Sequence, residues 1–371
     1  MKSFIHRSKA VMLSILALLF MTSGVAHSAC SADDLPTADQ LHITGLIHFN
    51  INVRDFPRSR EFYRAAGFID QIGPFPETNT LAVSNGVGID KLYRMHAELI
   101  HLGKIPDGPI DLTVPTGRMI DIIDWKDPER LDPPYAAINH MGMSYFSLKT
   151  QDIEDQLNRL TQAGATMLAG PVAESSGDLV AMVRDPDGTF VKFRQPSKGI
   201  PSVAKESIDY LNINVSDLDC SRQFYKMLGL ETQEANSSTG LTGQSQSDMT
   251  MAVKDPLGEL LGLGSTVVRR TENMYHRVDG AQIKLNQWIK PAAIGVPYPA
   301  PLTHLGIQRI NWASSDVDAD VALLKRHGIK FLSPITPCCE GEASTFGFII
   351  FEDPDGIYNQ IMGTIKPSVL P

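Results

Sequence analysis

The sequence Ser-Arg-Glu-Phe-Tyr-Arg at residues 59–64 has a close copy, Ser-Arg-Gln-Phe-Tyr-Lys, 162 positions later at residues 221–226. Three further markers return in the same order, at spacings that drift only from 162 to 168 positions. These markers are residues 48–55 with 210–217, residues 139–143 with 303–307, and Asp-Pro-Asp-Gly at 185–188 with 353–356. A repeat of fixed period sets the architecture of a chain, so we predict two tandem copies of one domain.

Each copy divides again into two quarters with the same order of elements. An alternating strand leads to an Asp that is expected to cap a short helix, and a Gly follows the helix. The expected caps are Asp55, Asp152, Asp217 and Asp316. About three further strands follow each helix, and the Asp-Pro-Asp-Gly sequences suit tight turns between antiparallel strands. The sequence therefore predicts an α+β fold built from four βαβββ units.

The boundaries of the parts follow from the repeats and from changes in composition. We expect a first domain at residues 41–196, with units at 41–133 and 134–196, and a second domain at residues 207–365, with units at 207–291 and 300–365. A Ser-, Gly-, Pro- and Lys-containing linker at 197–206 joins the two domains. Residues 234–247 are rich in Ser, Thr and Gly and predict a loop, either a lid over a pocket or a solvated surface loop.

Residues 1–29 have the features of a secretory signal peptide. A basic start precedes an apolar run at residues 10–20, and small residues lead up to Ala29. We expect cleavage near Ala29 and a secreted or periplasmic protein. An N-terminal membrane anchor and a lipid-modified Cys30 are the alternatives.

The composition of the remaining chain limits its partners. About 340 residues remain, enough for two domains, with 30 basic against 42 acidic side chains and a formal charge of −12. This charge disfavours nucleic acids and anionic membranes, and no membrane partner is expected after cleavage of the leader. Only four cysteines occur, too few for a disulfide framework: Cys30, Cys220, Cys338 and Cys339. The adjacent pair forms either a vicinal disulfide or two loop thiols.

The βαβββ pattern, the helix sequence at 59–63 and the Asp-Pro-Asp-Gly hairpins together resemble the vicinal oxygen chelate superfamily. That superfamily includes glyoxalase I, extradiol dioxygenases, epimerases and bleomycin-resistance proteins. The resemblance covers nearly the whole chain after residue 29. It implies that two units form a curled mixed sheet, whose concave face holds a divalent metal on ligands from the first and last strand of each unit. The fold hosts many reactions, so the resemblance does not identify the chemistry.

The resemblance also indicates which residues of this chain occupy the ligand positions. The first-strand positions hold His48, Tyr145, Tyr210 and Arg309, and the last-strand positions hold Asp121, Lys192, Lys284 and Gln360. We expect each half of the chain to form its own hollow, so that His48 and Asp121 lie with Tyr145 and Lys192. His48 and Asp121 would hold iron, manganese or zinc, or act as an acid–base pair.

In the second half the ligand positions have lost every His and carboxylate, so no metal is expected there. Tyr210, Lys284, Arg309 and Gln360 would instead bind a carboxylate, a phosphate or an enolate. Tyr210 beside a Lys is expected to have a lowered pKa and to act as an acid or base. The alternative is a decayed site in which these side chains only fill the hollow.

Four further residues admit a functional and a structural interpretation. His140 and His304 would either line a pocket mouth or bond to backbone at the crossover between units. Arg269 and Arg270 would add positive charge at a pocket rim.

These features predict an exported enzyme that acts on a small hydroxy or keto acid or a phenolic compound. Lyase or isomerase chemistry is favoured over metal-dependent ring cleavage by a dioxygenase, because the iron ligand set is incomplete. The alternative is a non-catalytic protein that sequesters a small molecule, of the bleomycin-resistance type. Four units in one chain are compatible with a monomer or a homodimer.

Overall fold

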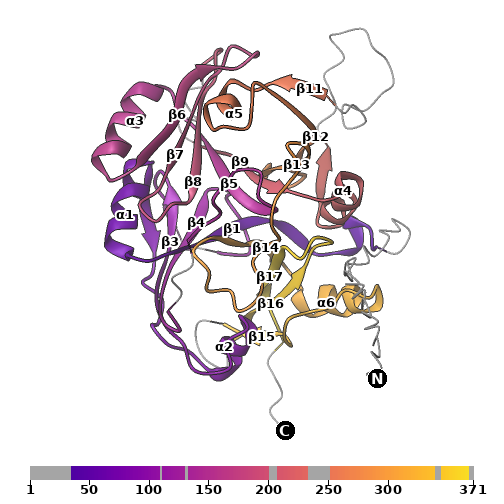
Figure 1. Cartoon of the computed structure of the whole chain (residues 1–371). Coiled ribbons are helices and arrows are strands. Elements are labelled where there is room, and N and C mark those ends of the chain that lie inside the picture. Colours follow the sequence, from indigo (N-terminus) through magenta and orange to yellow (C-terminus); the bar gives the residue numbers. More distant parts are fainter. Residues whose placement is uncertain are drawn as a thin grey trace, which may run out of the picture.

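The computed structural model describes residues 35–108, 111–129, 133–199, 207–232, 251–338 and 344–366. They form two curled mixed sheets, with α1, α3, α4 and α6 at the periphery of the molecule (Figure 1). The four βαβββ units and the α+β fold predicted from the repeats are confirmed. The predicted leader and the loop at 234–247 lie outside the described residues, as does most of the predicted linker.

The four units follow one another along the chain. The first contains β1 (Ile43–Val53), α1 (Phe56–Ala65), β2 (Phe68–Ile72), α2 (Leu81–Gly86), β3 (Arg94–Leu102) and β4 (Met119–Asp127). The second contains β5 (Gly142–Lys149), α3 (Ile153–Gln162), β6 (Thr166–Ala173), β7 (Leu179–Arg184) and β8 (Phe190–Gln195). The third contains β9 (Ser207–Asn214), α4 (Leu218–Met227), β10 (Leu230–Thr232), β11 (Met251–Lys254), α5 (Pro256–Leu260), β12 (Thr266–His276) and β13 (Gln282–Lys290). The fourth contains β14 (Gly306–Ser314), α6 (Val317–Arg326), β15 (Thr336–Pro337), β16 (Phe346–Glu352) and β17 (Tyr358–Thr364).

The pairing of the units differs from the prediction. The first sheet has the order β15-β16-β17-β14-β1-β4-β3-β2, so it joins the first unit to the fourth. The second has the order β10-β12-β13-β9-β5-β8-β7-β6, with β11 paired to β12, so it joins the second unit to the third. The seams are antiparallel: His48 of β1 lies opposite Asn311 of β14, and Tyr145 of β5 lies opposite Asn212 of β9. The expectation that each half forms its own hollow is therefore wrong.

The repeated helix sequence connects the two units of each half. The hydroxyl of Tyr63 on α1 donates a hydrogen bond to Asp185 Oδ2 at 2.8 Å, and Ser59 donates to Asp187 Oδ2 at 3.0 Å. Both carboxylates belong to the Asp-Pro-Asp-Gly turn of the next unit. The second half repeats this arrangement, since Tyr225 donates to Asp353 Oδ2 at 3.1 Å. The helix of one unit thus holds the turn of its neighbour, which gives both markers the same structural task in each half.

The helices begin where the sequence places their caps. The side chains of Asp55, Asp152, Asp217 and Asp316 each accept a hydrogen bond from a backbone N–H in the first turn. Such bonds satisfy donors that a helix leaves free at its start. Each helix is thereby set directly after the first strand of its unit.

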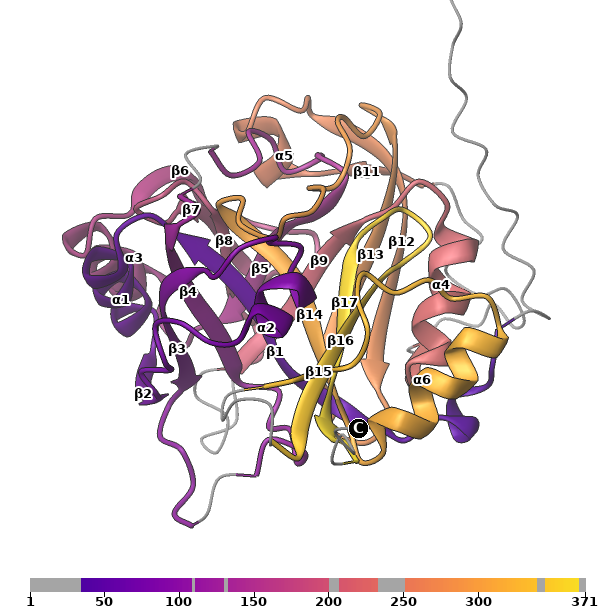
Figure 2. The same cartoon turned by 90° about the horizontal axis from the view of Figure 1, so that it is seen from below.

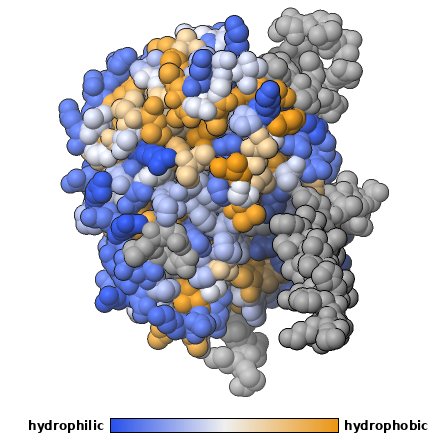
Figure 3. All heavy atoms as spheres, in the orientation of Figure 1, coloured by the Kyte–Doolittle hydropathy of each residue, from blue (hydrophilic) through white to orange (hydrophobic). Residues whose placement is uncertain are grey.

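The main apolar core lies between the sheets and their helices. Large, fully buried side chains contribute from all four units, among them Phe49, Phe146, Phe224 and Trp312. Exposed apolar surface lies over the upper part of the molecule in Figure 3, where α5 and β6 lie in Figure 1. Among the described residues, no helix has both the length and the apolar character that crossing a membrane requires.

Candidate functional site

The first sheet curls around a cavity that we call hollow A, with His48, Asp121, Arg309 and Gln360 on its polar floor. These side chains come from the central strands β1, β4, β14 and β17, and Figure 2 shows α2 in front of this part of the sheet. About 770 Å³ of space within hollow A is free of atoms, and part of it is open to solvent. Alternation along each strand directs these four residues to the concave face.

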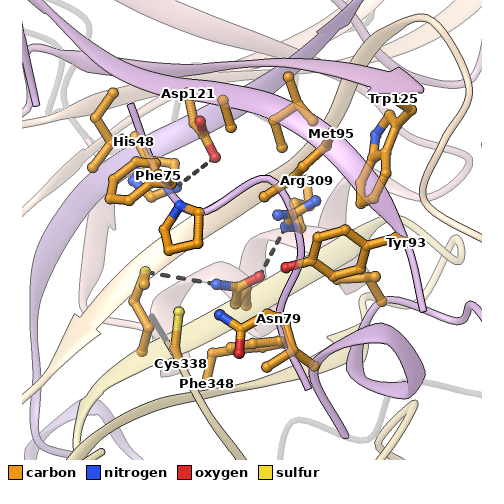
Figure 4. A pocket seen from close by; sticks show the side chains of 18 of the residues that line it. His48, Phe75, Asn79, Tyr93, Met95, Asp121, Trp125, Arg309, Cys338 and Phe348 are labelled. Atoms are coloured by element: carbon orange, nitrogen blue, oxygen red, sulfur yellow. Dashed lines mark hydrogen bonds and ion pairs between the residues drawn. The ribbon is translucent and has the colours of Figure 1, made fainter. Parts of the chain in front are cut away.

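The walls of hollow A are mostly apolar. Four aromatic residues line it, namely Phe75, Tyr93, Trp125 and Phe348 (Figure 4). The thiol of Cys338 also lines the cavity, whereas Cys339, its partner in the vicinal disulfide considered above, lies outside the described residues. A few polar groups set in an apolar cavity of this size are typical of small-molecule sites.

The floor of hollow A contains two short polar contacts. Asp121 Oδ2 accepts a hydrogen bond from Asn50 Nδ2 at 2.6 Å and lies 4.0 Å from His48 Nε2. Arg309 Nε donates to Gln360 Oε1 at 2.8 Å. These contacts hold the carboxylate at one end of the floor and the guanidinium at the other.

Three buried atoms on this floor have no hydrogen-bond partner among the described residues. They are His48 Nδ1, Asp121 Oδ1 and Arg309 Nη1. Leaving a buried polar atom without a partner costs about 1–3 kcal/mol, so such atoms are uncommon in folded proteins. These floor atoms suit a ligand that offers both acceptor and donor groups.

Burial displaces the pKa values on the floor in opposite directions. Burial, and then the charge of Arg309, lowers the pKa of His48 to about 3, so its imidazole is neutral near pH 7. Burial raises the pKa of Asp121 to about 7, although Arg309 and the hydrogen bond from Asn50 both oppose this rise. Asp121 can therefore gain or lose a proton near neutral pH, beside a permanent cation.

The residues on this floor do not fit a divalent metal. Within the described parts of the chain, no three His, Cys, Asp or Glu residues gather into a metal-binding group. A guanidinium and an amide stand where the resemblance implies the third and fourth ligands. Iron, zinc and manganese sites need about three His or carboxylate ligands, and Arg309 would repel the ion.

The second sheet brings the other four predicted residues together on its concave face, which we call hollow B. The rings of Tyr145 and Tyr210 lie 6.2 Å apart, and Lys284 Nζ lies 5.1 Å from the centre of the Tyr210 ring. Lys192 forms an ion pair with Glu174 at 2.8 Å. The lowered pKa expected for Tyr210 is wrong, because burial raises this pKa and the charge of Asp209 adds to the rise.

All eight predicted residues thus lie on concave sheet faces, but the two sets mix the halves of the chain. His48 and Asp121 lie with Arg309 and Gln360 rather than with Tyr145 and Lys192. Asn50 was not predicted, although it follows His48 by two positions and so shares its strand face. Phe75 was not predicted either, because this residue lies outside any strand or helix and carries no periodic signal.

The two crossover histidines have the structural role. His140 stacks on Tyr135 with ring centres 4.0 Å apart, Tyr135 stacks on Tyr298 at 4.1 Å, and Tyr298 stacks on His304 at 4.8 Å. His140 also bonds to the backbone oxygen of Met141. This four-ring stack joins the two crossovers between units.

The two arginines predicted at a pocket rim, Arg269 and Arg270, lie on opposite faces of the second sheet. Arg269 forms an ion pair with Asp255 at 3.0 Å and lies over the ring of Trp288 in hollow B. Arg270 forms an ion pair with Asp219 on α4, on the outer face of the sheet. Only Arg269 contributes charge to a hollow.

Comparison with known proteins identifies similar sequences and folds. The sequence profile of the Glyoxalase/Bleomycin resistance protein/Dioxygenase superfamily matches residues 95–193 and 207–361. Glyoxalase I from Zea mays is similar in structure, with a TM-score of 0.52 and 14% identity over 86% of this chain and 92% of that chain. A proposed dioxygenase from Bacillus subtilis has a TM-score of 0.49 and 15% identity over 88% of this chain and 86% of that chain. A comparison with curated proteins gave no match. At these identities, the structural likeness shows the fold alone.

Proposed function

The chain belongs to the Glyoxalase/Bleomycin resistance protein/Dioxygenase superfamily, and from that premise we propose that hollow A is the active site of an enzyme. Its substrate is a small hydroxy or keto acid or a phenolic compound. Its reaction is a lyase or isomerase step that begins with proton transfer and uses no divalent metal.

The observation that carries this proposal is the set of three unsatisfied buried atoms on the floor. Arg309 Nη1 offers a donor on a cation, which suits a carboxylate or an enolate oxygen. Asp121 Oδ1 offers an acceptor, or a donor when it is protonated. A molecule that joins an acidic oxygen to a hydroxyl or keto group would satisfy both ends of the floor, while its apolar part contacts the aromatic walls.

These residues support a proton abstraction next to a carbonyl group. Asp121 as carboxylate removes the proton from the carbon beside the carbonyl, and the electron pair of that C–H bond moves to form an enolate. Arg309 stabilises the negative charge on the enolate oxygen. Return of the proton to another atom gives an isomer, and expulsion of a neighbouring leaving group gives a lyase product. Neutral His48 donates a hydrogen bond to the substrate from one ring nitrogen.

A second candidate function is sequestration of an aromatic small molecule without chemistry. The observation that favours it is the aromatic lining from Phe75, Tyr93, Trp125 and Phe348. Large apolar contacts of this kind supply affinity without any reacting group. Ring cleavage by a metal-dependent dioxygenase receives no such support, because the floor does not fit the iron ion it needs.

Hydrogen exchange at the substrate carbon separates these functions. Purified protein is incubated in deuterated water with a panel of 2-hydroxy acids, 2-oxo acids and phenols, and exchange is followed by NMR while binding is followed by calorimetry. We expect exchange of one class of acid, at a rate that rises as pH passes about 7, where Asp121 loses its proton. Asp121→Asn should abolish the exchange and retain binding, whereas Arg309→Met should weaken both.

The control is Asp90→Asn at an exposed position, which should behave as the wild type. Binding without exchange of any acid would favour sequestration. If no compound binds, or if Asp121→Asn keeps its exchange rate, the proposed site is wrong.

We also propose that the chain is exported and cleaved after Ala29. The signal-like composition of residues 1–29 and the disulfide bond at Cys220 both support an oxidising compartment. The intact mass of the protein recovered from the periplasm or medium should correspond to a chain that begins at Cys30. A chain that keeps residues 1–29, or a lipid-modified Cys30, would contradict free export.

A further inference from the structure

Lys284 in hollow B is a cation without a counter-charge. It lies on β13, with Nζ over the ring of Tyr210 at 5.1 Å. Across the described parts of the chain, its ammonium makes no ion pair or hydrogen bond. Its side chain is only partly exposed, so water replaces the missing partner incompletely.

The neighbouring charged groups are already paired with one another. Lys192 on β8 bonds to Glu174 at 2.8 Å, and Arg269 on β12 bonds to Asp255 at 3.0 Å. Asp209 on β9 is held by Arg194 at 2.6 Å and by Lys149 at 3.3 Å. Each carboxylate near Lys284 therefore has a closer cation, and hollow B keeps one excess positive charge.

This environment favours the neutral amine. Burial lowers the pKa of Lys284 to about 7, and the charges of Lys192 and Arg269 add to the fall, while Glu174 and Asp209 oppose it. An ordinary exposed lysine has a pKa near 10.4 and is almost entirely protonated at pH 7. A desolvated lysine beside other cations is the arrangement that makes an amine nucleophilic toward carbonyl groups.

We propose that hollow B is a second ligand site, in which Lys284 forms an imine with a small aldehyde or ketone that bears a carboxylate. The amine nitrogen of Lys284 attacks the carbonyl carbon and forms a C=N bond. The carbonyl oxygen leaves as water and takes both protons of the amine. The imine nitrogen takes up a proton from water, and the ligand carboxylate offsets the resulting positive charge. The rings of Tyr145, Tyr210 and Trp288 provide apolar walls around the carbonyl carbon.

Reductive trapping tests the proposal directly. The mature protein is incubated at pH 7 with glyoxylate and sodium borohydride, then digested, and each lysine is examined by mass spectrometry. Reduction of the imine leaves a carboxymethyl group on the lysine nitrogen. We expect Lys284 to be modified roughly tenfold or more faster than Lys290, an exposed residue at the end of the same strand.

Two variants identify the cause of the trapping. Lys284→Arg keeps the positive charge but cannot form an imine, so this modification should disappear while the fold, followed by circular dichroism, is unchanged. Lys192→Met removes a neighbouring cation, so the labelling of Lys284 should shift to higher pH. Equal labelling of Lys284 and Lys290 would overturn the proposal. Glyoxylate that binds to Lys284→Arg as tightly as to the wild type would also overturn it, because that result indicates an anion site only.

Discussion

At the scale of single residues, hollow A shows how burial makes two ordinary side chains differ in proton affinity. His48 and Asp121 lie 4.0 Å apart, yet the pKa of the imidazole falls to about 3 and that of the carboxyl rises to about 7. Both shifts have one main cause, since burial disfavours whichever form carries the charge. The pair is thus mostly uncharged below neutral pH and offers one carboxylate base above it.

Asp121 should make the stability of the protein depend on pH. Its pKa is higher in the folded protein than the value of 3.8 for the unfolded chain, so folding favours its protonated form. This contribution is complete below pH 3.8 and is lost as pH rises through about 7. Asp121→Asn, which has no charge to bury, should raise the free energy of unfolding at pH 9 by about 2 kcal/mol.

The measurement is urea unfolding of both proteins at pH 5 and at pH 9. The difference between them should be smaller at pH 5 than at pH 9, because the loss accumulates between pH 3.8 and about 7. A constant difference across this range would show that Asp121 is ionised throughout.

At the scale of elements, the helix α4 and the turn after β16 depend on one another through buried hydrogen bonds. Tyr225 is fully buried, and its hydroxyl donates to Asp353, whose other oxygen accepts from the backbone of Asp355 and Ile357. The first half has the same contact between Tyr63 and Asp185. These bonds explain why the helix and turn sequences persist in both halves while the residues of the hollows differ.

Removal of this hydroxyl should weaken the fold measurably. Tyr225→Phe keeps the ring and leaves a buried carboxylate oxygen without its donor, so the free energy of unfolding should fall by about 1–2 kcal/mol. Tyr275→Phe is the matched control, because its hydroxyl bonds to Glu231 at the surface and its loss should change little. Thermal and urea unfolding measure both effects, and equal losses in the two variants would argue against the buried contact.

At the scale of the whole molecule, the two halves of the chain are interleaved. Within each half, a hydrogen bond between the helix of one unit and the turn of the next connects the two units. Between the halves, the sheets join the first unit to the fourth and the second to the third. Each hollow therefore receives residues from both halves. Arg309 reaches the same floor as His48 although 261 positions separate them in the sequence.

Separated halves should not form hollow A. In residues 30–199 alone, β1 and β5 lack their partners β14 and β9 and expose unpaired edges. We expect this half to associate with itself when alone, and to form a complex of one copy of each half when mixed with residues 200–371. Light scattering reports the masses. A stable monomeric half would show that the pairing of β1 with β14 and of β5 with β9 is not needed for folding.

Sequence patterns alone established the repeating units and their helix caps, because these depend on local periodicity and on Asp before a helix. The eight residues on the concave faces were indicated by the resemblance to the superfamily. Neither the partner of each unit nor the pKa values of Asp121 and Lys284 could be predicted in this way. Equivalent units present equivalent strand edges, so periodicity does not select between them. The pairing of β1 with β14 is visible in the folded chain alone, as are the burial and the charges that surround Asp121 and Lys284.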